Sequence, residues 1–507
     1  MSYRHFVQAQ QHNNPCLAGL SNFLFDSNSD RQSCRILKVD FSTGTGPEFQ
    51  HVSIKDLEEH IHPAEKQLQR RGRILIVEDV CRNVIETLGT AYRIDPIFFA
   101  SHIHAPFRQM SNQTPNLATL PSRQRKQNFV NFHYHRAVEL RGRVQNEQNL
   151  TRDMNVDRKI VVLLPSERTR VALVQHACSV ILLPDTKDSH EWLGIILVDS
   201  PILSGYLPVL YANGMESGDQ LPRRNSRIEC KLFLDGYEDF LPPISAFFDM
   251  AIKDAFCHPR LPRGGLLEDL QYYWNRELPQ EFDALRPSLF ALSIYPLKII
   301  AAEWNNYMAA MSYHIKRHEY AVEAANREMI ELDKLNVELR SLQAWRRRSL
   351  ASQHKIASVK NFLALHTSHA THHASHTIRE DEIELKDDYI YLADTLDDLS
   401  RRLKNMLPVV TSLVQISDSR RSLAESANIN RLTSLAIVFV PLSFTTGLFS
   451  MNTTNGPGGA NFWVFFTIAI PITIIVLLIA KPPIWIVHWI FNRDRTSPRL
   501  VRMKSQV

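Results

Sequence analysis

A histidine-rich segment, HTSHATHHASH, contains the residues best suited to bind a metal ion. His366, His369, His373 and His376 follow one another at steps of three and four, so they would share one face of a helix. Imidazole nitrogens bind zinc, and histidine also changes charge near neutral pH. No cysteine or carboxylate lies within the segment. The sequence therefore predicts either a zinc-binding or pH-sensing cluster, or a polar linker that is merely rich in histidine.

A second polar group, Ser450-Met451-Asn452, follows one apolar run and precedes the glycine-rich stretch TTNGPGG. The side-chain oxygen of Asn452 can accept hydrogen bonds, and asparagine is also common where a helix ends. Asn452 is therefore either a polar ligand or a helix cap. Asn452-Thr453-Thr454 also fits the pattern of a glycosylation acceptor, although a membrane edge would be an unfavourable place for one.

Other common chemistries have no motif in the chain. We find no Walker loop, GxSxG or HExxH pattern, so we expect neither an enzyme nor a resident cofactor. The net charge of +5 is small for 507 residues, and no nucleic-acid-binding motif is present, so no nucleic-acid partner is expected. The six cysteines are widely spaced and predict reduced thiols.

The residues from 432 to 480 contain no aspartate, glutamate, lysine or arginine. Two apolar runs, 432–449 and 462–480, are each long enough to cross roughly 30 Å of hydrocarbon. We predict two membrane spans, 432–451 and 462–480, joined by a short loop. Arginines precede the first run and basic residues follow the second, which places both chain ends in the cytosol. We expect the plasma membrane, with a vacuolar or other organelle membrane as the alternative.

The first run carries a polar stripe that the second lacks. Leu432, Val440, Ser443 and Gly447 recur at helical spacing, and serines and threonines cluster around them. Polar groups avoid lipid, so this helix should face protein or water. Small and hydroxylated residues also serve helix packing, which is the alternative. One striped helix cannot enclose a channel, so a pore would require several copies.

The rest of the chain divides into a helical stalk and an α/β domain. Apolar residues at heptad spacing from Tyr389 to Leu413 predict a long helix that continues into the first span, with Pro408 bending or weakening it. A second helical region is predicted over 298–345. Short runs rich in valine and isoleucine before residue 290 predict strands: RILIVED, NFVNFHYHRAVEL, KIVVLLP, CSVILLPD, LGIILVDSP and IECKLFL. The predicted fold is an α+β membrane protein: tail 1–30, cytosolic α/β domain 31–290, stalk 291–431 with a histidine-rich linker at 346–380, the hairpin 432–480, and basic tail 481–507.

At its C-terminal end the chain resembles the CorA family of divalent-cation channels, especially the divergent CorA-like proteins of fungi. In that family two C-terminal membrane helices are joined by a short loop, and Gly-Met-Asn ends the first helix. Here the motif reads Ser450-Met451-Asn452, after a segment, FVPLSFTTGLF, similar to the family's Pro-Leu-Thr segment. The resemblance covers residues 385 to 492 well and the α/β part only in outline.

The resemblance implies a homopentamer in a lipid bilayer, with five copies of the first helix around a pore for Mg²⁺. Asn452 would contact the hydrated ion at the mouth, beside Ser450 and Met451. Ser443 and the carbonyl group of Gly447 would contact the hydration shell below, while Val440 and Leu432 would form apolar constrictions.

Two departures leave the transported ion open. Ser450 replaces the glycine of the motif. The loop after Asn452 contains no acidic residue and looks more like the loop of the ZntB zinc transporters. The alternatives are therefore Mg²⁺ transport, Zn²⁺ transport, or a membrane-anchored scaffold or sensor that no longer conducts.

An acidic stretch lies between the histidines and the first span. Nine acidic side chains occupy residues 380–398, including Asp387, Asp388, Asp394, Asp397 and Asp398. In the family, cytosolic acids bind Mg²⁺ between subunits and close the channel, and this stretch is a candidate for that role. The solvated face of a stalk helix is the alternative.

Overall fold

The computed structural model describes most of the chain. Described are residues 2–26, 34–42, 46–61, 70–104, 120–141, 149–151, 154–156, 158–163, 170–183, 191–201, 207–209, 228–236, 240, 264–327, 332–370, 380–450 and 463–480. The chain divides into two compact units. One consists of residues 1–328 and 337–409, and the other of residues 329–336 and 410–507.

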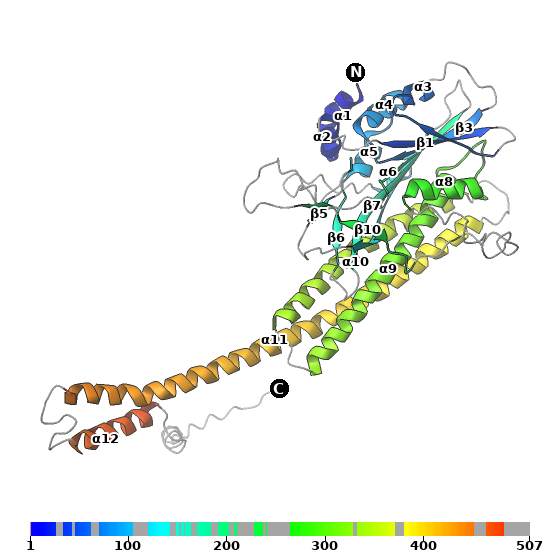
Figure 1. Ribbon diagram of the computed structural model, residues 1–507. Coiled ribbons are helices and arrows are strands. Elements are labelled where there is room, and N and C mark those ends of the chain that lie inside the picture. Colours follow the sequence, from blue (N-terminus) through cyan, green and yellow to red (C-terminus); the bar gives the residue numbers. More distant parts are fainter. Residues whose placement is uncertain are drawn as a thin grey trace, which may run out of the picture. The chain divides into compact units, whose positions relative to one another are not determined.

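An eight-stranded mixed sheet forms the centre of the first unit (Figure 1). Its strand order is β10-β4-β7-β8-β3-β1-β2, and β6 pairs with β7. Among the described strands of this sheet, β3 and β8 pair in parallel and the other pairs are antiparallel. The strands are β1 (Arg35–Ser42), β2 (Glu48–Val52), β3 (Arg70–Glu78), β4 (Phe129–Arg141), β6 (Ile160–Val162), β7 (Arg170–Leu183), β8 (Trp192–Val198) and β10 (Glu229–Leu232). The short strands β5 (Asn149–Thr151) and β9 (Leu207–Val209) pair separately.

Six of these strands lie where the valine- and isoleucine-rich runs predict them: β3, β4, β6, β7, β8 and β10. All seven residues of β8 are buried, as expected for a strand covered on both faces. β1 was not predicted, because its Lys38 and Asp40 interrupt the apolar run. In the structure Lys38 Nζ lies 2.9 Å from Asp40 Oδ2, so the two charges neutralise each other on one face of the strand.

The N-terminal residues are part of the α/β domain, so the predicted tail over 1–30 is wrong for the described residues 2–26. α1 (Tyr3–Gln11) and α2 (Ala18–Phe25) pack with α4 (Arg82–Tyr92) and α5 (Pro96–Ile103) in the main core cluster. The Tyr3 hydroxyl donates to the carbonyl oxygen of Ile94 at 2.8 Å, and its ring meets Phe99 edge-on. The tail prediction missed these helices because their apolar residues are few and scattered. Three further short helices complete this region: η1 (Pro15–Leu17), α3 (Leu57–Ile61) and α6 (Pro121–Gln124).

A buried ion network fixes the long helix α9 (Leu289–Arg327) to the sheet. Arg136 of β4 donates to Glu303 of α9 at 2.8 Å and to Asp269 of α8 (Leu266–Arg276) at 3.4 Å. All three side chains are almost completely buried. Such a network is stable only when each charge keeps its partner, so it determines where α8 and α9 lie against β4.

Two helices, not one, precede the last long helix of the stalk. α9 ends at Arg327, and α10 (Leu332–Ala370) follows it in the region that the sequence predicts as one helix over 298–345. α10 also includes residues 346–370, which the sequence assigns to a linker. The reason is a buried stripe of small and apolar residues at steps of three and four: Leu342, Trp345, Ser349, Ser352, Ile356, Val359 and Leu363. Two serines and the polar residues between them conceal this stripe in the sequence.

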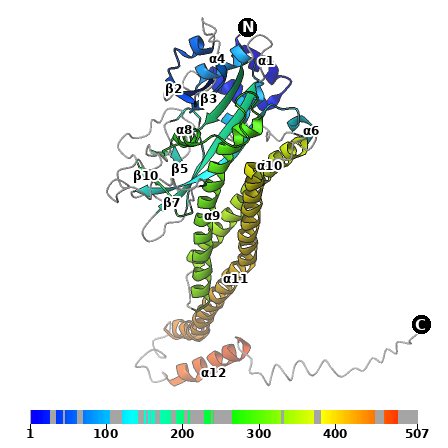
Figure 2. The same cartoon turned by 90° about the vertical axis from the view of Figure 1, so that its right-hand side faces the viewer.

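The predicted continuous helix is confirmed as α11 (Glu380–Ser450), which is 71 residues long. Most residues of its heptad seam are buried: Tyr389, Leu392, Leu396, Leu399, Leu403 and Val410. Met406 is half-buried, and Pro408 does not end the helix. In the first unit, α9, α10 and the beginning of α11 run side by side (Figures 1 and 2). The Tyr389 hydroxyl donates to the carbonyl oxygen of Leu297, and Lys298 of α9 pairs with Asp381 and Glu384 of α11. The heptad seam is thus covered by helices of the same chain.

We expect Tyr3→Ala to lower the free energy of unfolding of the α/β domain by about 3–5 kcal/mol, because it leaves a cavity and removes a buried hydrogen bond. Urea denaturation of the full chain in detergent, followed by tryptophan fluorescence, measures this change. Phe6→Ala is the matched control: Phe6 lies on the same helix but is 38% exposed, so the expected loss is under about 1 kcal/mol. Equal losses in both variants would contradict the packing of α1 into the core.

Candidate functional site

The C-terminal end of α11 packs against α12 (Trp463–Ala480) along one face (Figure 1). Pro441 and Thr445 are the buried residues of this part of α11, and Ala469 is the buried residue of α12. Phe449 meets Phe465 edge-on, with ring centroids 5.9 Å apart. A helical turn of 100° per residue places Pro441, Thr445 and Phe449 together on one side of α11. This side is therefore the contact face of the hairpin.

The striped residues lie on the opposite side of α11. Leu432 and Val440 are 68% and 66% exposed, and Ser443, Gly447 and Ser450 are also exposed. A Cβ added at Gly447 would meet no atom within 4 Å. Because α12 packs on the opposite face, the stripe is open within one chain, together with the exposed apolar residues Phe439, Phe444 and Leu448.

The hydroxyl groups near the stripe bond to their own helix. Ser443 donates to the carbonyl oxygen of Phe439, and Thr446 donates to that of Leu442. Thr433 and Ser434 likewise donate to the carbonyl oxygens of Ile429 and Asn430, which lie four residues before them. This pattern satisfies a polar side chain without a partner helix, and the hydroxyl oxygen keeps its acceptor capacity.

Ser450, the first residue of the predicted motif, is the last described residue of α11. Met451 and Asn452 lie outside the described residues. α11 is the one described helix that is both long and apolar enough to cross a membrane. The second predicted span corresponds to α12, whose Trp463–Leu478 stretch falls among the shorter apolar helices.

The predicted histidine cluster is only partly described. His366 and His369 belong to the last two turns of α10, but their side chains, and all of His373 and His376, lie outside the described residues. Among the described side chains, no group of three or more histidine, cysteine, aspartate or glutamate residues is arranged to hold a metal ion. The zinc-binding prediction therefore stays untested.

The acidic stretch forms the first turns of α11, and several of its carboxylates pair with cations of the chain. Asp397 and Asp398 bind Arg401 and Arg402 one turn along, at 2.9 and 3.0 Å, in solvent-exposed pairs. Asp387, Asp388 and Asp394 lie on the same helix. Exposed pairs of this kind contribute little to stability, which agrees with a solvated helix face.

The more buried end of the stretch is held by Lys298. Its Nζ atom lies 2.9 Å from both Asp381 Oδ1 and Glu384 Oε2. Burial alone would lower the pKa of Lys298, but the two carboxylates outweigh burial and raise that pKa. Lys298 therefore remains charged and neutralises these acids.

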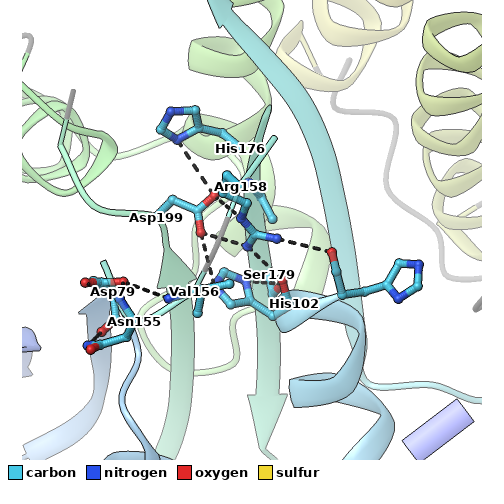
Figure 3. A network of polar contacts seen from close by, with 10 residues as sticks. Asp79, His102, Asn155, Val156, Arg158, His176, Ser179 and Asp199 are labelled. Atoms are coloured by element: carbon cyan, nitrogen blue, oxygen red, sulfur yellow. Dashed lines mark hydrogen bonds and ion pairs between the residues drawn. The ribbon is translucent and has the colours of Figure 1, made fainter. Parts of the chain in front are cut away.

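A polar network inside the α/β domain fixes the segment around Arg158 (Figure 3). Arg158 binds Asp199 through two nitrogens, at 2.8 and 2.7 Å, and donates to the carbonyl oxygens of His102 and His104. Asp199 also accepts from the amide of Ala177 at 2.7 Å. Four of the five N–H groups of the Arg158 guanidinium are used, so this buried pair positions the chain.

A second part of the network anchors the same segment at Asp79. This residue has a positive φ of 52°, and its carboxylate accepts from the amides of Asn155 and Val156. Asn155 in turn donates to the carbonyl oxygen of Asp79 at 2.9 Å. Next to it, His102 Nδ1 lies 2.9 Å from Ser179 Oγ, and burial holds the pKa of His102 well below its ordinary value.

One arrangement with the geometry of a catalytic triad was not predicted, because its members are far apart in the sequence. Ser341 Oγ lies 3.1 Å from His318 Nε2, and His318 Nδ1 contacts Glu338. Ser341 and Glu338 lie on α10, and His318 lies on α9. The amide of Ser341 is inside α10, where backbone N–H groups bond to the preceding turn and cannot stabilise an oxyanion. The three residues therefore join α9 to α10.

Comparison with known proteins connects the C-terminal part of the chain to one family. Residues 280–488 match the family described as CorA-like Mg²⁺ transporter protein. They include α9, α10, α11 and α12. No curated protein matches the chain.

Two solved structures align with most of the chain at low similarity. One is the complete structure of the CorA magnesium transporter from Methanocaldococcus jannaschii, at 12% identity and a TM-score of 0.33, covering 89% of this chain and 98% of that one. The other is the full-length CmaX protein, at 13% identity and a TM-score of 0.35, covering 92% and 98%. From residue 280 to residue 488, the chain carries the sequence pattern of CorA-like Mg²⁺ transporter proteins.

Proposed function

We propose that the chain is a CorA-like transporter that conducts a divalent cation, Mg²⁺ in the first place, through a homopentameric pore lined by α11. The family match over residues 280–488 supports the transporter class. The pore assignment depends on one observation. The striped face of α11, with Ser443 and Gly447, lies opposite the face that packs on α12 and is open within one chain.

This geometry favours a ring of α11 helices with α12 outside. The α12 helix is almost purely apolar, as a lipid-facing helix should be, whereas the open face of α11 carries hydroxyls and a glycine. Copies of α11 around an axis would turn that face toward a common lumen while each contact face stays on its own α12. Both chain ends would then be cytosolic.

Hydration chemistry explains the choice of side chains along the lumen. Mg²⁺ loses water reluctantly, so a pore that conducts it contacts the water shell rather than the ion. The neutral amide of Asn452, at the mouth beside Ser450 and Met451, can accept hydrogen bonds from that shell and release the ion again. Ser443 and the backbone of Gly447 would make the next contacts. Val440 and Leu432 would form apolar constrictions.

The same geometry accommodates Zn²⁺, which is the second candidate ion. The loop after Asn452 carries no acidic residue to concentrate cations, and the histidines from His366 to His376 are zinc ligands by type. A membrane-anchored scaffold that does not conduct is the third possibility. Measurements of ion flux distinguish these three possibilities. Mg²⁺ flux supports the first and Zn²⁺ flux driven by a proton gradient supports the second. The absence of any divalent-cation flux supports the scaffold.

We expect Asn452→Ala to reduce Mg²⁺ flux into proteoliposomes at least tenfold, because the mouth would lose the group that contacts the hydrated ion. A fluorescent Mg²⁺ indicator inside the vesicles measures the rate, and a parallel series with a Zn²⁺ indicator tests the second ion. Asn455→Ala is the matched control, since it removes the same side chain three residues further along, and its flux should stay within about twofold of the wild type. Equal flux in all three proteins would refute the role of Asn452.

We expect a positively charged thiol reagent to block flux through Ser443→Cys and to leave Thr445→Cys unaffected. Residue 443 lies on the open face of α11 and residue 445 on the face against α12, so only the first thiol would project into the lumen. The six native cysteines all precede residue 260, and reagent-treated wild type controls for them. Block of both variants, or of Thr445→Cys alone, would contradict the assigned faces.

The oligomeric state has its own test. A detergent-corrected mass other than that of five chains would refute the pentamer.

A further inference from the structure

The first half of β4 forms part of the edge of the described sheet, and α10 covers it. β10 pairs with β4 only from Val138 to Arg141. Before that stretch, β4 meets α10 through side chains: the rings of Phe132 and Phe362 lie 5.5 Å apart, and Lys355 Nζ lies 3.4 Å from His135 Nε2. This contact therefore combines an aromatic pair with a polar pair.

Three alternate residues of this strand, Asn131, His133 and His135, share one face and carry unsatisfied polar atoms. Asn131 Oδ1, His133 Nδ1 and His135 Nδ1 are shielded from solvent and have no hydrogen-bond partner within the described part of the chain. The residues themselves stay partly exposed. A shielded polar atom without a partner costs free energy, so these three atoms are candidates for contact with a bound polar group.

Among the described residues, the ionisable groups that influence this face are all basic. The groups that act on the pKa values of His133, His135 and Lys355 are Arg158, Lys159, Arg348 and His104, besides the three themselves. Burial, and then the charge of Arg158, lowers the pKa of Lys355 to about 7. Asp199 already neutralises Arg158. The Lys355 ammonium therefore faces other cations and has no described carboxylate as a counter-ion.

The lysine is also held in a defined position. It donates one N–H to His135 Nε2, and the His135 ring stacks on Tyr307 with centroids 5.5 Å apart. Tyr307 is in turn fixed by a hydrogen bond from Ser352, at 3.2 Å. An ammonium group has three donors, so two N–H groups of Lys355 remain for another acceptor.

We propose that Lys355, His133 and Asn131 form a binding site for a small oxyanion of the phosphate or sulfate class, at the contact between β4 and α10. The oxyanion accepts from the two remaining N–H groups of Lys355. It also accepts from His133 Nδ1–H, in the neutral tautomer that carries its proton on that nitrogen, and from the Asn131 amide, whose oxygen and nitrogen can exchange places by a rotation. The bound anion supplies the missing negative charge and joins α10 to the sheet. This site is independent of the proposed transport.

Sulfate tests the proposal most directly, because it stays doubly charged between pH 6 and pH 8. Calorimetric titration of the full chain in detergent should give saturable binding at millimolar sulfate or below. Binding should be about tenfold tighter at pH 6 than at pH 8, since Lys355 is charged only below about pH 7. Inorganic phosphate should compete with sulfate. Competition by adenosine monophosphate as well would assign the phosphate group to a larger ligand, and failure to compete would assign a free oxyanion.

Lys355→Gln should weaken sulfate binding at least tenfold and abolish its pH dependence. Lys360→Gln, the same substitution on the same helix, should leave both unchanged. The urea midpoint without sulfate checks folding: Lys355→Gln should match or exceed the wild type, since it removes a shielded charge that has no described counter-ion. Absence of saturable binding by the wild type, or equal binding by both variants, would overturn the proposal.

Discussion

The charge of Arg136 is the constraint on which the first unit depends. Its guanidinium group projects from β4 with almost no contact to water, and it is tolerated only because Glu303 and Asp269 meet it there. Removing one partner of such a network costs about 3–5 kcal/mol, so α9 and α8 have little freedom to lie elsewhere. The first turns of α11 then depend on α9, through Tyr389 on the Leu297 carbonyl and through Lys298. The position of the first turns of α11 therefore depends, through α9, on the ion network around Arg136.

Patterns that repeat along one element were predictable from the sequence. The valine- and isoleucine-rich strands, the heptad seam from Tyr389 and its continuation into an uncharged run all appear in the structure. In the strands and along the seam the residues that carry the signal are buried, whereas the residues of the uncharged run are largely exposed within one chain. The opposite faces of the last turns of α11 follow from the same periodicity, since Ser443 and Thr445 differ by 200° around the helix.

Features that depend on distant partners were not predictable. Tyr3 looks like part of a polar tail until Ile94 and Phe99 are placed around it. Ser349 and Ser352 hide the buried stripe of α10, because a serine reads as a surface residue unless its neighbour across the helix pair is known. The same holds for Ser341, His318 and Glu338, and for Lys355 beside His135. These contacts join residues 20 to 220 positions apart, and no local pattern marks them.

Lys298 changes what the acidic end of α11 can offer to a metal ion. An ammonium group that is part of the same chain is present at a high effective concentration, regardless of the surrounding salt. A divalent cation that bound Asp381 and Glu384 would have to displace this group, and the displaced lysine would lose its two hydrogen bonds in a partly buried place. Occupancy of these two carboxylates by a metal is therefore a competition between an external ion and an internal one. The outcome would depend on whether α9 and α11 stay together at this point.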